Sequence, residues 1–263
     1  MNITPNDLRL FAEHLKNEGK APHTVLVYTN KADKFAQYAG DSEITPHLLE
    51  AYRGDILSRY NTPRTQNTNV SVTNIFLHFL GSAHFMTPVE CDHYKLYSKK
   101  TALSADELKK LLACADGRLE RAGLLAEVFA RTGIRTGELA YLTVDALERG
   151  YFVTTWRNIT RKVILSSALL EHLTHYVNEQ HIDGGPILVT RTGRAMNQRD
   201  AYWLLKALAD AAGIDRNKVN PMTLRQLFAK TYFDKFGDLT GLTDLLGIKE
   251  IEQAALYVTR EHG

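Results

Sequence analysis

Apolar side chains recur at helical spacing through the first third of the chain. Four amphipathic stretches follow one another there, each with apolar residues three or four positions apart. Thr4 before Pro5 predicts the start of the first helix and Thr45 before Pro46 that of the third, because threonine caps a helix and proline suits its first turn. Gly19 predicts the end of the first helix. The pattern predicts a small four-helix bundle. The side chains expected to face its core include Leu8, Phe11, Ala12 and Leu15, then Val25, Tyr28, Ala32, Phe35 and Tyr38, and finally Val72, Ile75, Phe76 and Phe79.

The pattern changes near residue 100. The segment "KLYSKKTALSADEL" ends with Ser104 and Glu107, a capping box that predicts a new helix. We therefore place a domain boundary there, between residues 1–98 and 99–263. The stretch "GYFVTTWRNITRKVILS" is rich in β-branched and aromatic residues and predicts two or three short strands around Asn158. The predicted fold is mainly α with a small β-sheet. Helices of the second part are expected over residues 105–115, 119–132, 137–146, 167–181, 198–212, 223–236, 239–246 and 250–257.

The composition excludes several classes of protein. With 44% hydrophobic and 24% charged residues, the chain is typical of a soluble globular protein. No apolar run reaches the roughly 18 residues of a membrane span, and the first twenty residues are too polar for a secretory signal, so we expect a cytoplasmic protein with no membrane partner. The two cysteines lack the spacing of metal ligands. The net charge of +2 neither requires nor excludes a nucleic acid, because the placement of charge matters more than its sum.

One arginine does not fit its helix. In "VNPMTLRQLFAKTYF", residues 219–233, Arg225 lies among leucines and phenylalanines that are expected in a core. Arginine stays charged in proteins, so its burial without a partner is very costly. Arg225 therefore either reaches solvent or meets an anion. Arg135, in "ARTGIRTGELAYL", is by itself compatible with a surface arginine in a turn, and Tyr257 is by itself compatible with a core tyrosine on an apolar helix face.

Taken together, these segments resemble the tyrosine recombinase (phage integrase) family. The order "TGIRTGEL", then "MTLRQLFA", then "LTDLLGIKEIEQAALY" is similar to three family motifs: a T-G-[L/I]-R-x-x-E-L turn, an H-x-L-R-H box, and an L-G-H motif with a tyrosine nine residues after its histidine. Ile248 and Tyr257 keep that spacing. The segment "VTRTGRAMNQRDAYWLLKALADAAGI" and the amino-terminal helices are similar as well, so the resemblance covers nearly the whole chain.

The resemblance implies a fold and a chemistry. It implies an N-terminal helical SAM-like core-binding domain and a C-terminal α+β catalytic domain. The anion is then a DNA phosphate, whose non-bridging oxygens Arg135 and Arg225 would clamp, a task suited to the planar guanidinium fork. Tyr257 would attack phosphorus and hold the strand as a 3′-phosphotyrosine while a 5′-hydroxyl leaves, without a metal, another cofactor or ATP. Glu138 would anchor the turn.

Three positions depart from the family pattern. Met222 stands where the H-x-L-R histidine is expected, and Ile248 where the L-G-H histidine is expected. Arg157 aligns best with the hairpin lysine that protonates the leaving oxygen in the family, and arginine is a poor proton donor. Lys162 would substitute for it only if the strand register differs. Loss of a general acid costs about 10² to 10⁴ in rate, so the sequence predicts a slow or inactive enzyme.

Three functions stay open. The chain could be a site-specific DNA strand transferase for integration, excision or inversion, a DNA-binding regulator or passive partner of an active recombinase, or a helical interaction protein that does not touch DNA. The expected partners are double-stranded DNA, further copies of the chain in a tetramer on paired sites, or a partner recombinase. Candidate DNA contacts, each also compatible with a solvated surface charge, are Lys99, Lys100, Arg64, Arg191 and Arg194.

Overall fold

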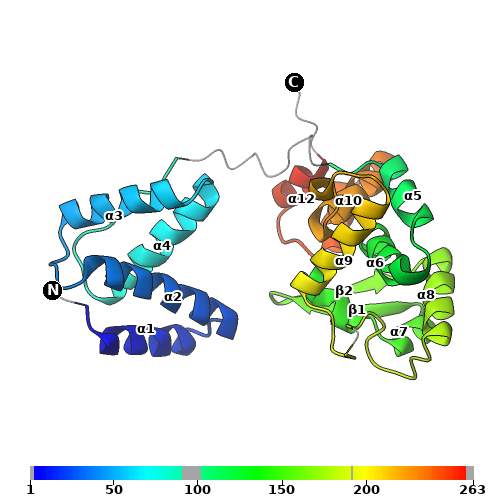
Figure 1. The fold of residues 1–263 in the computed structure, drawn as a ribbon, viewed down its shortest axis with the longest axis horizontal. Helices are drawn as coiled ribbons and strands as arrows, with labels where there is room; N and C mark the ends of the chain where they lie inside the picture. The colour runs from blue at the N-terminus through cyan, green and yellow to red at the C-terminus, as the bar shows by residue number, and fades with distance from the viewer. Residues whose placement is uncertain (1–2, 91–101, 191, 259–263) are drawn as a thin grey trace. The chain divides into compact units, whose positions relative to one another are not determined.

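The chain divides into two compact units, Met1–His93 and Tyr94–Gly263, in the computed structural model (Figure 1). The structure describes residues 3–90, 102–190 and 192–258. The domain boundary predicted near residue 100 lies outside the described residues. Each unit has its own buried apolar cluster, so each is described by itself.

The N-terminal unit is a bundle of four helices: α1 (Pro5–Asn17), α2 (Pro22–Ala39), α3 (Pro46–Arg59) and α4 (Pro63–Phe79). Each helix has a proline in its first turn, and three of them begin at a threonine whose hydroxyl accepts a backbone hydrogen bond: Thr4, Thr45 and Thr62. The predicted inward stripes are largely buried, including Phe11, Phe35 and Phe76. Two predictions are wrong: Tyr38 and Ile75 keep 38% and 39% of their surface exposed. Both lie at the margin of a helical stripe, where residue type alone does not fix which side faces the core.

The C-terminal unit surrounds one central helix. Its elements, in chain order, are α5 (Ala105–Ala113), η2 (Gly117–Leu119), α6 (Glu120–Thr132), η3 (Thr136–Tyr141), α7 (Val144–Arg149), β1 (Tyr151–Trp156), β2 (Ile159–Ile164), α8 (Ser167–Glu179), α9 (Gln198–Ala211), η4 (Arg216–Lys218), α10 (Pro221–Phe236), α11 (Leu239–Leu246) and α12 (Ile251–Val258). Helix α6 packs against α5, α8, α9 and α10. The prediction of a mainly helical chain with a small β-sheet is confirmed.

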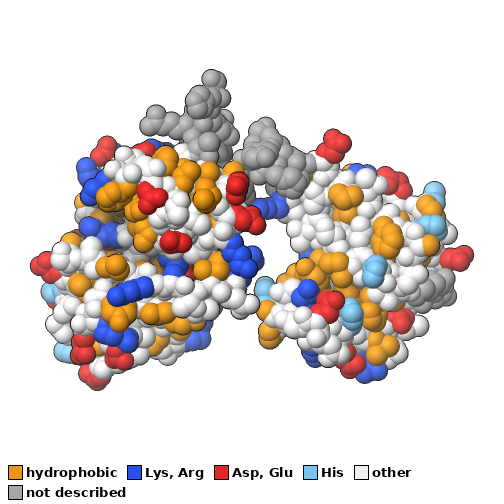
Figure 2. Space-filling model, turned by 180° about the vertical axis from the view of Figure 1, so that it is seen from behind, with side chains coloured by type: hydrophobic (Ala, Val, Ile, Leu, Met, Phe, Trp, Pro, Cys, Tyr) orange, Lys and Arg blue, Asp and Glu red, His pale blue; other side chains and the backbone are white. Residues whose placement is uncertain are grey.

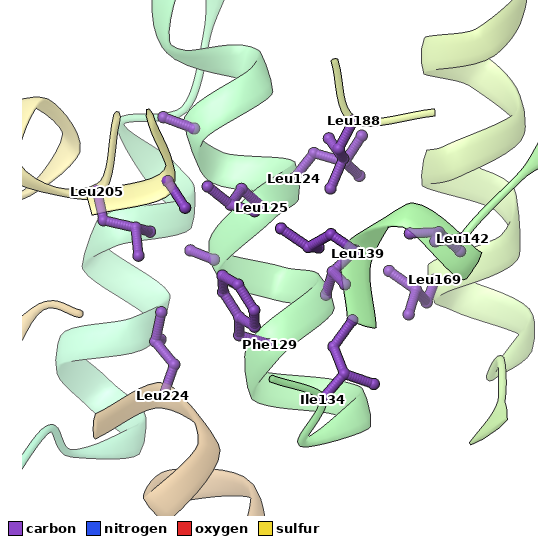
Figure 3. Packing of buried hydrophobic residues seen from close by; sticks show 14 of the residues in the cluster. Leu124, Leu125, Phe129, Ile134, Leu139, Leu142, Leu169, Leu188, Leu205 and Leu224 are labelled. Carbon is purple, nitrogen blue, oxygen red and sulfur yellow. The ribbon is translucent and has the colours of Figure 1, made fainter. Parts of the chain in front are cut away.

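Leucine and phenylalanine side chains fill the space around α6. Figure 3 shows Leu125 and Phe129 of α6 close to Leu139 of η3, with Leu205 of α9 and Leu224 of α10 on the other side. All five are at most 1% exposed. Arg225 is the residue after Leu224, so this packing fixes the start of α10 against α6.

The helix predicted over residues 137–146 is interrupted. A 3₁₀ helix, η3, ends just before Leu142, and an extended Thr143 then leads into the short helix α7. Residues 142–144 pair instead with the loop before α9: Ile187 donates to the carbonyl of Leu142, and Val144 donates to the carbonyl of Gly185. These two hydrogen bonds replace helical ones, which explains the break.

Strands β1 and β2 form a two-stranded antiparallel hairpin. Its two-residue turn is Arg157–Asn158, and both residues have positive φ, 49° and 63°, as hairpin turns of type I′ require. The register pairs Thr154 with Arg161 and Val153 with Lys162. Neighbouring residues of a strand point to opposite faces, so Arg161 and Lys162 face different surroundings.

Candidate active site

Arg225 is fully buried and satisfied by oxygen atoms from three parts of the chain. It lies in the second turn of α10, whose start is fixed by Asn220, the capping residue, and by Pro221. The residue is 2% exposed. Its Nη1 donates to the carbonyl of Gly133, its Nη2 to the carbonyl of Leu246 at 2.6 Å, and its Nε to the hydroxyl of Tyr257 at 3.4 Å. The arginine therefore does not reach solvent.

Arg135 reaches the same place from the end of α6. Gly133 ends that helix in the left-handed conformation, φ 62°, where the ring of Phe228 leaves no room for a Cβ. Arg135 follows in an extended conformation, and its Nη2 donates to the carbonyl of Gly247 at 3.0 Å. Its Nη1 is buried and has no hydrogen-bond partner among the described residues. The guanidinium lies 5.8 Å from the ring centroid of Trp156.

Tyr257 brings its hydroxyl to the two arginines. It lies in α12, which Ala254 anchors by complete burial. Its hydroxyl accepts from Arg225 and lies 3.8 Å from the sulfur of Met222. Gly247, between α11 and α12, adopts the left-handed conformation, φ 58°, that turns the chain there. The structure thus gathers Arg135, Arg225 and Tyr257, which are far apart in the sequence.

A third arginine, which the sequence reasoning missed, belongs to this cluster. Arg161 of β2 has a side chain only 7% exposed, and its Nη2 lies 2.8 Å from Oε2 of Glu138. The same carboxylate accepts from the backbone N–H of Arg135 at 2.6 Å and from the hydroxyl of Thr154 at 3.1 Å. Glu138 is 1% exposed, so it is the buried anchor of the turn, as the sequence analysis expected.

The cluster holds more positive than negative charge. Burial and, next, the charge of Arg225 lower the pKa of Arg135 to about 10. Burial also lowers the pKa of Arg161, although the attraction of Glu138 opposes this. Three guanidinium groups and one carboxylate leave two positive charges that these four groups do not balance among themselves. An anion bound here would offset the repulsion between these positive charges.

An open cleft of about 430 Å³ lies over the cluster. Its lining comes from the turn after α6, the hairpin, α9, α10 and α12: Ile134, Arg135, Thr136, Gly137, Trp156, Gln198, Tyr202, Asn220, Pro221, Met222, Arg225 and Tyr257. Trp156, Tyr202 and Met222 keep between 36% and 47% of their surface exposed. Among the described residues, this lining contains no histidine, lysine, cysteine or carboxylate.

Comparison with known proteins gives the family. Residues 101–262 match the model of the phage integrase family. The chain belongs to this family of tyrosine recombinases. It is 26% identical to the tyrosine recombinase XerA of Thermococcus kodakarensis, over 98% of this chain and 93% of that protein.

Solved structures of the integrase family share the fold. The Tn1549 transposon integrase in complex with transposon right end DNA has a TM-score of 0.76 at 12% identity, covering 97% of this chain and 95% of that one. A lambda integrase dimer bound to a COC′ core site has a TM-score of 0.75 at 18% identity, covering 98% and 96%. At these identities the likeness concerns the fold.

Of the three positions that depart from the integrase pattern, only Met222 lines the cleft. Met222 lies beside the Tyr257 hydroxyl, as described. Ile248 is partly buried in a small apolar cluster with Leu242 and Leu246. Arg157 occupies the hairpin turn and is not part of the cleft lining, whereas Trp156, one residue earlier, is. The sequence reasoning overlooked Trp156 because a tryptophan in a strand is ordinarily a packing residue.

Lys162 is not brought to Tyr257. It lies on the opposite side of β2 from Arg161, and its Nζ is 3.7 Å from the centroid of the Tyr151 ring. It lines a separate hollow of about 310 Å³, to which Ile248 also contributes. Its replacement of the family lysine would require a movement of the hairpin.

Two of the five predicted DNA contacts can be placed. Arg64 is exposed in the first turn of α4. Arg194 is exposed as well, but its Nη2 lies 2.7 Å from Oδ2 of Asp200, so its charge is already paired. The other three lie outside the described residues: Lys99, Lys100 and Arg191.

The N-terminal unit has a cationic group that the sequence reasoning did not single out. Nζ of Lys31, on α2, donates to Oδ1 of Asn69, on α4, at 2.6 Å. Burial and the neighbouring charge of Lys34 lower the pKa of Lys31.

Surface charge is mixed on both units. On the faces seen in Figure 2, lysine and arginine side chains are interspersed with acidic and apolar ones rather than gathered into one basic field. None of the helices within residues 3–90, 102–190 and 192–258 combines the length and apolar character needed to cross a membrane. The same residues contain no group of three or more His, Cys, Asp or Glu side chains that could hold a metal ion.

Proposed function

We propose that this chain is a DNA-binding, integrase-type tyrosine recombinase whose strand cleavage and rejoining is slow. Arg135 and Arg225 bind the non-bridging oxygens of a DNA phosphodiester, and Tyr257 is the nucleophile. The phenol oxygen forms a bond to phosphorus, the bond from phosphorus to the 5′-oxygen breaks, and the strand is held as a 3′-phosphotyrosine. Attack by a 5′-hydroxyl reverses the step and rejoins a strand, so no external energy source is needed.

One observation carries this proposal: the hydroxyl of Tyr257 accepts a hydrogen bond from the buried Arg225 at the edge of a cleft that Arg135 also lines. A donated hydrogen bond stabilises the phenolate that develops as the tyrosine attacks. Fixed guanidinium donors also stabilise the charge that builds on the phosphate oxygens in the transition state. The uncompensated positive charge of the cluster suits a phosphodiester, which carries one negative charge.

The low rate follows from the rest of the cleft lining. The leaving 5′-oxygen must gain a proton, and the attacking phenol must lose one. Met222 offers only a weak thioether acceptor, and Trp156 only a weak donor. Each missing helper costs about 10² to 10⁴ in rate if it is a general acid or base, and such losses do not add cleanly. We expect a rate at least about a thousandfold below that of a complete site, which corresponds to the loss of one or two such general acids or bases.

A second function is favoured by the same contact between Met222 and Tyr257. An apolar neighbour that cannot take the tyrosine proton fits a protein that binds DNA without cutting it, as a regulator or as a partner of an active recombinase. The phosphate clamp would then serve affinity alone.

Duplex DNA is the proposed partner in both cases. Arg64, Lys99, Lys100, Arg191 and Arg194 are proposed contacts outside the cleft, and further copies of the chain, up to a tetramer on paired sites, are the proposed assembly. Family neighbours support this: one lambda integrase structure is described as a dimer on a core site and another as a tetramer bound to a Holliday junction. We place the protein in the cytoplasm, where its DNA substrate would be.

Covalent trapping tests the proposal. A pool of duplexes of random sequence, each carrying one nick, is incubated with the protein, and adducts that survive denaturation are isolated. We expect a slow adduct that Tyr257→Phe abolishes. Tyr202→Phe is the matched control, because Tyr202 lines the same cleft without contacting Arg225 in the hydrogen bonds described above.

Each outcome separates the two functions. An adduct that persists in Tyr257→Phe would refute the assignment of the nucleophile. No adduct after prolonged incubation, together with duplex binding that weakens steeply with salt as phosphate contacts require, would establish the binding function instead.

A further inference from the structure

The C-terminal end of α11 is a meeting point of three arginines. Three consecutive backbone carbonyls there each accept one hydrogen bond from a different guanidinium: Leu245 from Arg161, Leu246 from Arg225 and Gly247 from Arg135. The last carbonyls of a helix have no partner within it and carry the negative end of its dipole. The arginine cluster is therefore also the cap of α11, the helix that precedes α12 and Tyr257.

Arg161 joins this cap to the carboxylate of Glu138. Its Nη1 donates to Leu245, and its Nη2 donates to Glu138 at 2.8 Å. Glu138 in turn accepts from the backbone N–H of Arg135. A continuous set of hydrogen bonds thus runs from the end of α11, through Arg161 and Glu138, to the backbone of Arg135.

Arg161 is not among the residues that line the cleft over Tyr257. Its side chain is 7% exposed, both terminal nitrogens donate to protein oxygens, and it lines instead the separate hollow beside Lys162 and Ile248. It packs so closely against Gly247 that a Cβ there would lie 2.8 Å from its Nε. A phosphate in the cleft over Tyr257 would meet Arg135 and Arg225, which line it, so Arg161 acts on that phosphate through the groups that it holds.

We propose that Arg161 is a positioning residue of the phosphate site, holding the end of α11 and the Glu138 turn in the one arrangement that aligns Arg135, Arg225 and Tyr257. The expected effect on catalysis rests on the proposed function, whereas the expected effect on the arrangement of the arginines does not. The fork geometry is essential: one guanidinium spans a carbonyl and a carboxylate at once, whereas a lysine ammonium is a point charge on a flexible stem. Misplacement of reacting groups by about 1 Å can cost about a hundredfold in rate.

The test compares Arg161→Lys with Arg149→Lys. Arg149 also donates to a backbone carbonyl, that of Asp145, but lies exposed on α7, so it controls for the loss of a guanidinium–carbonyl bond. Adduct formation on a nicked duplex and affinity for an intact duplex are measured for both. For Arg161→Lys we expect the adduct rate to fall about a hundredfold and duplex affinity to change less than about threefold, since the exposed contacts are untouched. Arg149→Lys should match the parent in both.

A direct readout of the clamp accompanies the kinetics. Nitrogen-15 NMR of arginine side chains detects hindered rotation of guanidinium groups that are hydrogen-bonded and buried. In Arg161→Lys, the signals of Arg135 and Arg225 should shift and lose that hindrance, while Arg131, paired with Glu127 elsewhere on α6, should not change. If the parent forms no adduct, the catalytic function fails, and this readout alone decides the inference.

The inference is overturned if the Arg135 and Arg225 signals in Arg161→Lys equal those of the parent, or if rate and affinity fall by the same factor. Should Arg161→Lys not fold, the double variant Arg161→Met/Glu138→Gln removes both buried charges and is judged by the same signals and the same ratio.

Discussion

Replacing Glu138 by glutamine isolates the charge of the buried carboxylate. Oε2 accepts from the backbone of Arg135 and from Arg161, and Oε1 accepts from Thr154. A glutamine amide can keep its oxygen at the first position and turn its NH₂ toward Thr154, whose hydroxyl can accept instead of donate. Every hydrogen bond then survives, and the loss is that of the negative charge, which pairs with Arg161 and, through Oε1, with Nη1 of Arg135 at 3.8 Å.

The expected cost is large because the cluster is buried. With Nη2 of Arg161 2.8 Å from Oε2, the charge centres are about 4 Å apart, which corresponds to about 4 kcal/mol at an effective dielectric constant of 20. Removing one partner of a buried ion pair costs about 3 to 5 kcal/mol in measured cases. We therefore expect Glu138→Gln to lower the free energy of unfolding of the C-terminal unit by about 3 to 5 kcal/mol.

Urea unfolding followed by tryptophan fluorescence measures this quantity. The chain has two tryptophans, Trp156 and Trp203, and both belong to the C-terminal unit, so the signal reports that unit. Glu127→Gln is the control. Glu127 is 3% exposed, but its partners Arg131 and His172 are themselves 41% and 55% exposed, so its loss leaves no buried cation and should cost about 1 kcal/mol or less.

The two variants also differ in their expected effect on DNA. Glu138→Gln removes a negative charge close to the proposed phosphate, so duplex affinity should stay the same or increase despite the lower stability. Glu127→Gln should leave affinity unchanged. If Glu138→Gln were as stable as Glu127→Gln, or if it bound duplex more weakly while still folded, the carboxylate would not be balancing the arginine cluster and the electrostatic reasoning would be wrong.

Three further predictions follow from single contacts. Met222→His places an imidazole beside the Tyr257 hydroxyl and should raise the single-turnover adduct rate at least tenfold, since general acid–base catalysis contributes about 10² to 10⁴; an unchanged rate would show that proton transfer is not limiting. The hydrogen bond from Lys218 lowers the pKa of Glu107. The pair therefore stabilises the fold at pH values above 4.5, the ordinary pKa of glutamate, and this stabilisation is lost as the pH falls through the lowered pKa. Glu107→Gln should therefore reduce stability by about 0.2 to 1 kcal/mol at pH 7 and by progressively less as the pH falls below 4.5, and a difference independent of pH in thermal unfolding would contradict this. Gly133→Ala places an alanine in the left-handed conformation against the ring of Phe228, and in the same measurement it should lower the free energy of unfolding by more than about 1 to 2 kcal/mol. Gly213 is also left-handed but has open space around it, so Gly213→Ala should show only the cost of the left-handed backbone conformation.

The elements that the sequence predicted well are those whose signals are local. Proline after a capping residue predicted the starts of the first and third helices, and the capping box at Ser104 predicted the start of α5 to the residue, although α5 ends two residues before the predicted end at residue 115. The helix over residues 137–146 could not be predicted correctly, because the backbone groups of Leu142 and Val144 pair with a loop more than forty positions later in the sequence.

The same distinction applies to the site. Arg135, Arg225 and Tyr257 were found because they stand in motifs, whereas Arg161 stands in a strand with ordinary alternation and is recognised only once the register places it beside Glu138. Trp156 was missed for a related reason. Trp156 ends β1, one residue before Arg157, the residue that aligns with the family lysine. Whether Trp156 or Arg157 faces the cleft depends on the type of hairpin turn, which the positive φ angles of Arg157 and Asn158 determine.

The energetics of the cluster favour phosphate binding as the property that the site serves. Buried ion clusters are often less stable than apolar residues of similar size, by about 1 to 4 kcal/mol, and a chain that only needed to fold would do better with leucine or methionine at Arg225 and Arg161. The chain has such apolar residues at Met222 and Ile248, where the family pattern has histidine, yet it keeps two buried guanidinium groups, those of Arg161 and Arg225, and the half-buried one of Arg135 close together beside a cleft open to solvent. An uncompensated positive charge is useful only when an anion arrives, and the anion need not react. The strength and salt dependence of duplex binding therefore test the arginine cluster independently of turnover: a chain whose Arg225→Met variant bound duplex with the parent's salt dependence would have no use for the charge that it buries.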